Sequence, residues 1–211
     1  IQKQGGSIQS AEVTDVIKRD GNVIAVKTVD GREIEADHFL FSGGAWTPDL
    51  ARKLGCPLPM QAGKGYSFTL NQPRELPRLC SLLKEGRVAV TPMGDGLRVA
   101  GTMEICGNDL SVDEQRTRGI VDSFCEFFPT FERTDFDGLE IWSGLRPCSP
   151  DGMPYIGRVP ELKNAFIATG HAMLGLSLGP VTGRIVAGLL SGKDADSRLE
   201  PARFHRGVFW R

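Results

Sequence analysis

One stretch, residues 141–157, constrains the fold more than any other part of the chain. Its sequence, Ile-Trp-Ser-Gly-Leu-Arg-Pro-Cys-Ser-Pro-Asp-Gly-Met-Pro-Tyr-Ile-Gly, predicts a short apolar strand followed at once by a rigid corner. Pro147 fixes its own φ angle and disfavours a helical conformation for Arg146. Pro150-Asp151-Gly152 is typical of a tight turn that returns the chain into a second strand. The stretch therefore predicts an arginine held on stiff, non-helical backbone.

Two interpretations of Arg146 stay open at this point. Its planar guanidinium could bind a carboxylate through two parallel hydrogen bonds. Alternatively, Arg146 is an ordinary arginine at the end of a strand, paired with a nearby acidic side chain.

A second informative stretch covers residues 165–190. It predicts a short buried strand, then a loop over residues 170–175, then a helix in which Gly175, Gly179 and Gly183 recur every four residues. That spacing places the three glycines on one helix face. Because glycine in a helix costs about 1 kcal/mol relative to alanine, the repeat predicts a helix that packs closely against a sheet or a ring system.

The first part of the chain predicts a β-meander that leads into a helix. Asp-Gly pairs separate apolar runs and favour hairpins, so we expect strands over residues 12–19, 23–29 and 33–41. After Ser42-Gly43-Gly44-Ala45-Trp46, Thr47 is the expected N-cap of a helix that Gly55 closes.

Residues 57–142 predict a different, α+β domain. We expect strands over residues 64–70, 87–92 and 97–104, then a helix that opens at a capping box, Ser111-Val112-Asp113-Glu114, and stops at Pro129. Residues 193–211 predict a polar surface tail.

Composition excludes several classes of protein. A length of 211 residues with 40% hydrophobic content suits one large or two small domains. A net charge of -1 with both signs interspersed argues against nucleic acid or an anionic membrane surface as the main partner. Five cysteines without a Cys-x-x-Cys pair indicate a reducing compartment, with neither a disulfide framework nor a metal site. No apolar run approaches the roughly 20 residues of a transmembrane helix. We therefore expect a cytoplasmic protein.

Five motifs in order resemble one family. They are Phe-Leu-Phe-Ser-Gly-Gly-Ala-Trp, Val-Ala-Val-Thr-Pro-Met with Leu-Arg-Val-Ala-Gly-Thr, Trp-Ser-Gly-Leu-Arg-Pro, Pro-Asp-Gly-Met-Pro-Tyr-Ile-Gly and Thr-Gly-His-Ala-Met-Leu-Gly. Together they resemble the glycine/D-amino-acid oxidase superfamily of FAD-dependent oxidoreductases, and most of all its bacterial D-amino-acid dehydrogenase branch. No Gly-x-Gly-x-x-Gly occurs in the chain, so the N-terminal Rossmann βαβ unit of such enzymes is not part of it. The resemblance therefore implies the C-terminal part of a larger flavoenzyme, inactive without the missing N-terminal FAD-binding part.

The resemblance implies a mixed α+β and α/β fold in three segments. Residues 1–56 would be the first pass through a partial FAD-binding domain, with a β-meander, a strand and a helix. Residues 57–142 would be an inserted substrate domain with a mostly antiparallel sheet and a flanking helix. Residues 143–211 would return to the FAD-binding domain and end in the tail.

The resemblance also assigns roles to residues. Arg146 would bind the substrate carboxylate, and His171 would either contact flavin or substrate or serve the loop structurally. Non-covalent FAD would be contacted by residues around two turns and one strand: Gly44, Ala45, Trp46, Gly144, Gly170, Leu174, Gly175, Leu176 and Ser177. The positive end of the helix dipole near Leu176 suits the negative charge that reduced flavin carries.

The implied activity is oxidation of a D-amino acid. Hydride would pass from Cα–H to flavin, and the imine would hydrolyse to a 2-oxo acid and ammonia. Electrons would go on to an acceptor such as a quinone, with oxygen less favoured, in the cytoplasm or at the inner face of the membrane. The alternatives are a non-catalytic subunit or isolated substrate-binding module, and an oxidase of glycine, sarcosine or an opine. Some oxidase relatives have a tyrosine in the region of Ala89, whereas Val88-Ala89-Val90 offers no hydroxyl group. This departure argues against a glycine-like preference and for a bulkier amino acid.

Overall fold

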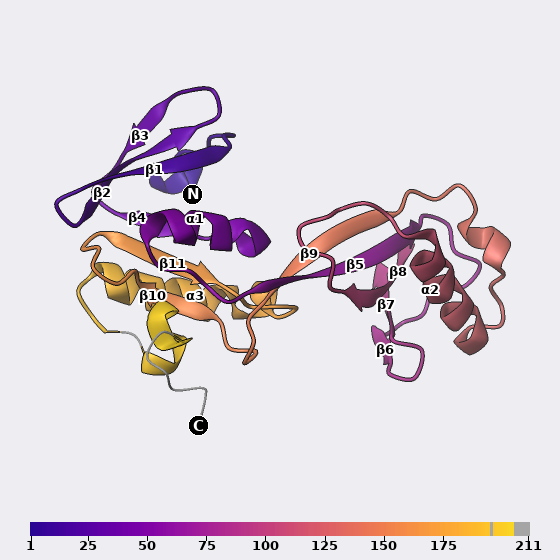
Figure 1. Cartoon of the computed structure of the whole chain (residues 1–211). Helices are drawn as coiled ribbons and strands as arrows, with labels where there is room; N and C mark the ends of the chain where they lie inside the picture. Colours follow the sequence, from indigo (N-terminus) through magenta and orange to yellow (C-terminus); the bar gives the residue numbers. More distant parts are fainter. Residues whose placement is uncertain (195, 205–211) are drawn as a thin grey trace. The chain divides into compact units, whose positions relative to one another are not determined.

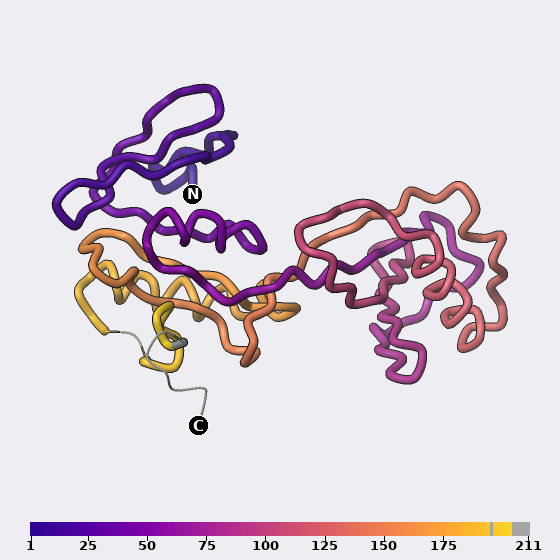
Figure 2. The backbone as a smooth tube through the Cα atoms, viewed as in Figure 1, coloured from indigo at the N-terminus to yellow at the C-terminus, as the bar shows by residue number. Residues whose placement is uncertain are grey.

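The computed structural model describes residues 1–194 and 196–204, which divide into two compact units. The discontinuous unit combines Ile1–Met60 with Pro147–Arg211, and the central unit is Gln61–Arg146. The chain leaves the discontinuous unit after Met60 and returns to it at Pro147 (Figure 2). The segment boundaries expected from the sequence lie four residues earlier at both crossings.

The discontinuous unit begins with a three-stranded antiparallel meander (Figure 1). Its strands are β1 (Val13–Arg19), β2 (Asn22–Thr28) and β3 (Glu33–Glu35). Asp20 and Gly21 both have positive φ angles, 51° and 74°. A two-residue turn of this kind matches the twist of the flanking strands, which is why Asp-Gly favours a hairpin.

The expected third strand over residues 33–41 is wrong, because β3 and β4 (Phe39–Phe41) belong to different sheets. The side chain of Asn164 explains the break. Its Nδ2 donates to the carbonyl oxygens of Val23 and Asp37, and its Oδ1 accepts from the Val23 N–H. The Phe39 N–H in turn donates to the Asn164 carbonyl. Asn164 therefore directs the chain out of the meander and into the second sheet.

The second sheet carries helices on both faces (Figure 1). Its order is β10 (Tyr155–Arg158), β11 (Ala165–Thr169) and β4, with β10 and β11 antiparallel and β11 and β4 parallel. Alternate residues of β11 point to opposite faces. Ile167 packs in the cluster that includes α1 (Thr47–Leu54), and Phe166 packs with α3 (Gly175–Leu190). The alternating side chains of β11 thus belong to two hydrophobic clusters, one on each face of the sheet.

The ends of α1 bear out one expectation and correct another. Gly55 closes the helix in the left-handed conformation, with φ 85°. Thr47, expected as the N-cap, is instead the first helical residue, and Trp46 occupies the cap position. The Thr47 hydroxyl donates to Thr169 Oγ1 at 3.3 Å inside the core, which makes it unavailable for capping.

The expected surface tail is exposed over residues 193–194 and 196–198, but the expectation is wrong at Pro201 and Arg203, which are buried. Residues 197–199 and 201–204 form short 3-10 helices. Arg203 is buried there, with its guanidinium 3.9 Å from the centre of the Tyr155 ring and 2.9 Å from Asp151 Oδ1. Residues 195 and 205–211, which the same expectation included, lie outside the described residues.

The central unit is a five-stranded sheet with one helix on it (Figure 1). The strand order is β6 (Ser81–Leu83), β7 (Val88–Met93), β8 (Gly96–Glu104), β5 (Gln61–Leu70) and β9 (Trp142–Cys148), and the pairs from β6 to β5 are antiparallel. The helix is α2 (Glu114–Phe127), whose buried Phe124 packs in one cluster with Phe68 and Val99. The mixed fold class with mostly antiparallel sheets is therefore confirmed.

The capping box expected at Ser111 is wrong. Helix α2 begins at Glu114, and the Asp113 side chain caps it by accepting from the Arg116 N–H at 3.0 Å. Ser111 uses its own N–H and hydroxyl to donate to Asp109, so it is engaged in the preceding loop.

Among the described residues no helix is long and apolar enough to cross a membrane.

Gly119 offers a test of the α2 assignment. It is exposed in the middle of the helix, and a Cβ atom built on it meets nothing within 4 Å. Gly119→Ala should therefore stabilise the chain by about 1 kcal/mol in urea unfolding. Gly101→Ala is the matched control: its Cβ would lie 2.9 Å from Ile120 Cγ1 and 3.1 Å from the Arg87 carbonyl oxygen, so it should destabilise. A lower stability for Gly119→Ala would contradict the assignment.

Candidate active site

Arg146 lies on β9 with its guanidinium held against the sheet of the central unit. Its Nη1 donates to the carbonyl oxygens of Thr102 at 3.1 Å and Gly63 at 3.3 Å. Directly beneath it is Gly65, where a Cβ atom would lie 2.3 Å from Nη1. We call this arrangement, formed by Gly63, Gly65 and Thr102, the arginine seat.

A β-bulge forms one side of the arginine seat. On β5 and β8, Lys64 pairs with Glu104 and Tyr66 pairs with Gly101, so one residue of β5 stands opposite two of β8. Thr102 lies in the bulge with a φ angle of 72°, which is rare for a β-branched residue. Bulges re-aim backbone and side-chain groups next to functional sites. Here the carbonyl oxygen of Thr102 accepts from the guanidinium.

Beyond the seat, the sheet face opposite α2 carries small side chains. Tyr66 and Phe68 pack with α2, so strand alternation points Ser67 to the other face. Ser67 pairs with Ala100, which pairs with Ala89. Ala89, noted in the sequence for its lack of a hydroxyl group, thus belongs to a row of three small residues.

Gly144 lies next to Arg146 on the same face of β9. A Cβ atom at Gly144 would be 2.1 Å from Cη2 of Trp142, so the indole ring covers this glycine. Trp142 itself is 59% exposed. The role of Gly144 as a cofactor contact stays a prediction.

In the discontinuous unit, His171 follows β11 and is tied to α3. Its Nε2 lies 2.9 Å from Thr182 Oγ1, and its backbone forms a bridge with Cys148. Gly170 allows this turn with a φ angle of 83°. Burial lowers the pKa of His171, so the imidazole is neutral near pH 7. These contacts give His171 a structural role in the loop, and its catalytic role stays a prediction.

The start of α3 is exposed. Leu174 is 58% and Leu176 95% exposed, and the first helical bond runs from the Leu178 N–H to the Leu174 carbonyl. Gly175, Leu176 and Ser177 therefore present the leading N–H groups of the helix. Cβ atoms built on Gly179 and Gly183 meet nothing within 4 Å, so no sheet of the described residues packs against these two glycines, and packing against a ring system stays a prediction.

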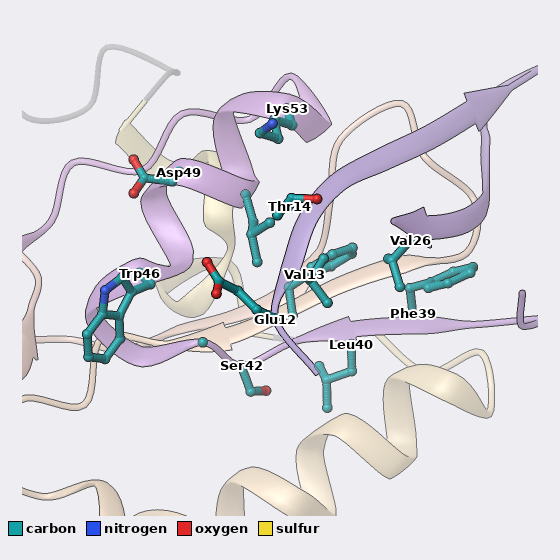
Figure 3. Close-up of a pocket in the computed structure, with 13 residues that line it drawn as sticks. Glu12, Val13, Thr14, Val26, Phe39, Leu40, Ser42, Trp46, Asp49 and Lys53 are labelled. Carbon is teal, nitrogen blue, oxygen red and sulfur yellow. The ribbon is translucent and has the colours of Figure 1, made fainter. Parts of the chain in front are cut away.

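A cavity of about 730 Å³ lies between the meander, β4 and α1 (Figure 3). Its walls are mostly apolar, with Glu12, Asp49 and Lys53 as the charged members. The lining residues are Glu12, Val13, Thr14, Val26, Phe39, Leu40, Phe41, Ser42, Gly43, Trp46, Asp49, Leu50 and Lys53.

The turn after β4 brings one of the expected cofactor residues to this cavity. Trp46 lines it, together with Ser42 and Gly43. Ala45 is buried, and the Gly44 carbonyl accepts from Thr169 Oγ1 at 3.1 Å. Residues from β1 and α1 were missed because no motif marks them; only the fold brings them to the turn. Among the described residues no group of three or more His, Cys, Asp or Glu side chains could hold a metal ion.

Comparison with known proteins decides the family. A family profile described as "FAD dependent oxidoreductase" matches residues 1–189. The chain belongs to this family.

The chain is similar to several proteins named as amino-acid or amine oxidoreductases. The chain is 34% identical over 197 residues to a D-amino acid dehydrogenase of Xanthobacter autotrophicus, covering 92% of this chain and 46% of that protein. The glycine oxidase structure from Geobacillus kaustophilus superposes with a TM-score of 0.77 at 26% identity, covering 92% of this chain and 52% of that one. The iminodiacetate oxidase structure from Chelativorans gives a TM-score of 0.80 at 23% identity, covering 95% and 55%, and shows the shared fold alone. The chain thus spans about half the length of these relatives.

The described residues fit part of the family's cofactor. The cavity combines mostly apolar walls with a glycine-containing turn, and mostly apolar walls are usual for cofactor sites. Leading N–H groups at α3 suit negative charge. A phosphate-binding Gly-x-Gly-x-x-Gly does not occur in the 211 residues. These described surfaces would account for some of the contacts of FAD, and those contacts stay a prediction.

The lowered pKa of His171 predicts a pH dependence of stability. Because the folded chain binds this proton less readily than the unfolded chain, His171 contributes full stability above its ordinary pKa of 6.5 and loses it as the pH falls below. From about pH 7.5 to about pH 5.5, the free energy of unfolding should therefore fall more in the wild type than in His171→Gln. Urea unfolding of both proteins at the two pH values measures this, and equal falls would contradict it.

Proposed function

We propose that the chain forms the substrate-binding and flavin-facing part of an enzyme that oxidises D-amino acids. The seated guanidinium of Arg146 is the observation that carries the proposal. Membership of an FAD-dependent oxidoreductase family and similarity to a D-amino acid dehydrogenase support it.

Arg146 would bind the α-carboxylate of the substrate. A guanidinium presents five N–H donors in a planar fork that matches a carboxylate. Each charge-assisted hydrogen bond contributes about 1.5–3 kcal/mol, which is enough to fix the orientation of a small amino acid. The seat holds the fork at one position, so the substrate binds in one orientation.

The row of small residues beside the seat would accommodate the substrate side chain. Ser67, Ala100 and Ala89 have small side chains on this sheet face, and none of them carries a charge. This favours an amino acid larger than glycine. An oxidase of glycine or another small secondary amine is the alternative, favoured by the similarity to a glycine oxidase structure.

Bound FAD would supply the hydride acceptor for the Cα–H bond. The substrate amine would lose a proton to solvent, and water would hydrolyse the resulting imine to a 2-oxo acid and ammonia. Exposed N–H groups at the start of α3 would lie where negative charge develops, which is favourable at the positive end of a helix. The protein's own contribution is thus to hold the carboxylate and to stabilise charge.

The electron acceptor is proposed to be a quinone rather than oxygen. The word "dehydrogenase" in the name of the Xanthobacter relative supports this. Because quinones dissolve in membranes, the protein would work in the cytoplasm at the inner face of the membrane.

We also propose that FAD is bound without a covalent link, so acid precipitation of the holoprotein should leave the yellow colour in solution.

Arg146→Ala in the full-length, FAD-loaded protein tests the proposal. It should lower kcat/KM by about 10²-fold or more, because an unpaired carboxylate costs about 2–5 kcal/mol. Bound FAD should be retained. Arg146→Lys keeps the charge without the fork and should be intermediate. Arg118→Ala is the matched control, since Arg118 is exposed and pairs only locally with Glu114. Turnover by Arg146→Ala equal to that of the control would reject the role.

Substrate profiling separates the proposal from its alternative. Full-length protein should oxidise a panel of D-amino acids in preference to their L-isomers, glycine and sarcosine, with a quinone analogue reduced faster than oxygen. Initial rates with each substrate and acceptor measure this. A preference for glycine or sarcosine would favour the alternative, and no turnover of any amine would favour a non-catalytic binding module.

A further inference from the structure

We infer that Gly65 positions the carboxylate-binding arginine, by leaving the space that the guanidinium occupies. The inference rests on the proposed role of Arg146 and deepens it. Gly65 touches neither substrate nor cofactor in this account, so it is a positioning residue.

The distances leave no room for a side chain at Gly65. A Cβ atom there would lie 2.3 Å from Nη1, 2.4 Å from Nη2 and 2.7 Å from Cζ of Arg146. All three lie well inside the roughly 3.5–4.0 Å optimum for contact between non-bonded atoms. With alanine at this position, either the guanidinium or the β5 backbone must move.

The backbone is fixed from the other face of the sheet. Lys64 and Tyr66 flank Gly65 and point away from Arg146, as strand alternation requires. Lys64 is 1% exposed, and its Nζ lies 2.8 Å from the Ser111 carbonyl and 3.7 Å from Glu104 Oε2. The Tyr66 hydroxyl donates to the same Glu104 carboxylate at 2.6 Å.

This network also fixes the bulge. Glu104 is the pairing partner of Lys64 on β8, two residues beyond Thr102. Arg116 of α2 reaches the same carboxylate at 3.4 Å. Burial alone would lower the pKa of Lys64, but hydrogen bonds with Tyr66 and Asp109 outweigh burial and raise it, so the amine stays charged.

The guanidinium is therefore the part that moves. It ends a flexible side chain, whereas β5 and β8 are tied on both sides of Gly65. A methyl group at Gly65 would lift the guanidinium off the carbonyl oxygens of Gly63 and Thr102. The fold and the α2 face would remain as they are, and the carboxylate would lose its partner.

A double-mutant cycle in the full-length, FAD-loaded protein tests this inference. Gly65→Ala should lower kcat/KM by about 10²-fold, as expected for a misplaced binding group, and raise KM more than it lowers kcat. In the Arg146→Ala background it should have no further effect. Thermal stability and FAD content of Gly65→Ala should match those of the wild type, and Gly119→Ala, the same substitution at an open position of the same unit, should keep wild-type kcat/KM.

A crystal structure of Gly65→Ala gives a second, independent readout. The guanidinium should have left the carbonyl oxygens of Gly63 and Thr102, with β5 unmoved. Any of three results would overturn the inference. They are an unmoved guanidinium in Gly65→Ala, a wild-type kcat/KM of that variant, or an equal loss of kcat/KM on adding Gly65→Ala to the wild type and to Arg146→Ala. If Gly65→Ala fails to fold, the double variant should fold, and failure of both would overturn it too. Full activity of Arg146→Ala would instead reject the proposed function. The crystal structure of Gly65→Ala would still show whether Gly65 positions the guanidinium in the arginine seat.

Discussion

The position of the Arg146 guanidinium depends on a backbone site, Gly65, that carries no side chain. Arg146 lies on Gly65 because only glycine leaves room there, and its Nη1 donates to two carbonyl oxygens, one of which a β-bulge directs toward it. On the opposite face, buried Lys64 and the carboxylate of Glu104 fasten the same two strands. Charge pairing on one side of the sheet therefore sets the geometry of a charged group on the other.

The discontinuous unit contributes surfaces of a different kind. A two-sided sheet places α1 and the β4 turn beside a largely apolar cavity, and it places α3 on the other face with its first turn exposed. The chain belongs to a family of FAD-dependent oxidoreductases, and these two surfaces are the ones proposed to contact the cofactor. The chain spans about half the length of its relatives.

Local signals predicted local structure well. Asp20-Gly21 formed the expected turn and Gly55 the expected helix end, because both depend on φ angles that few residues adopt. Other local signals, such as those for helix caps, failed because tertiary contacts override them. Thr47 turned inward to Thr169, and Ser111 was engaged by Asp109, so neither caps a helix. Asn164, more than a hundred residues away, broke the expected strand at residue 37. For the site, the motif around Arg146 was visible in the sequence, but its partners Gly65 and Thr102 were not, since strand pairing alone brings them together.

A structure of the full-length protein with FAD and a non-reacting amino-acid analogue tests the central claim most directly. The account predicts that the analogue's carboxylate lies within about 3 Å of the Arg146 guanidinium, which stays over Gly65. The side chain of the analogue should lie along Ser67, Ala100 and Ala89. A carboxylate bound by another cation, with Arg146 turned away from it, would contradict the account.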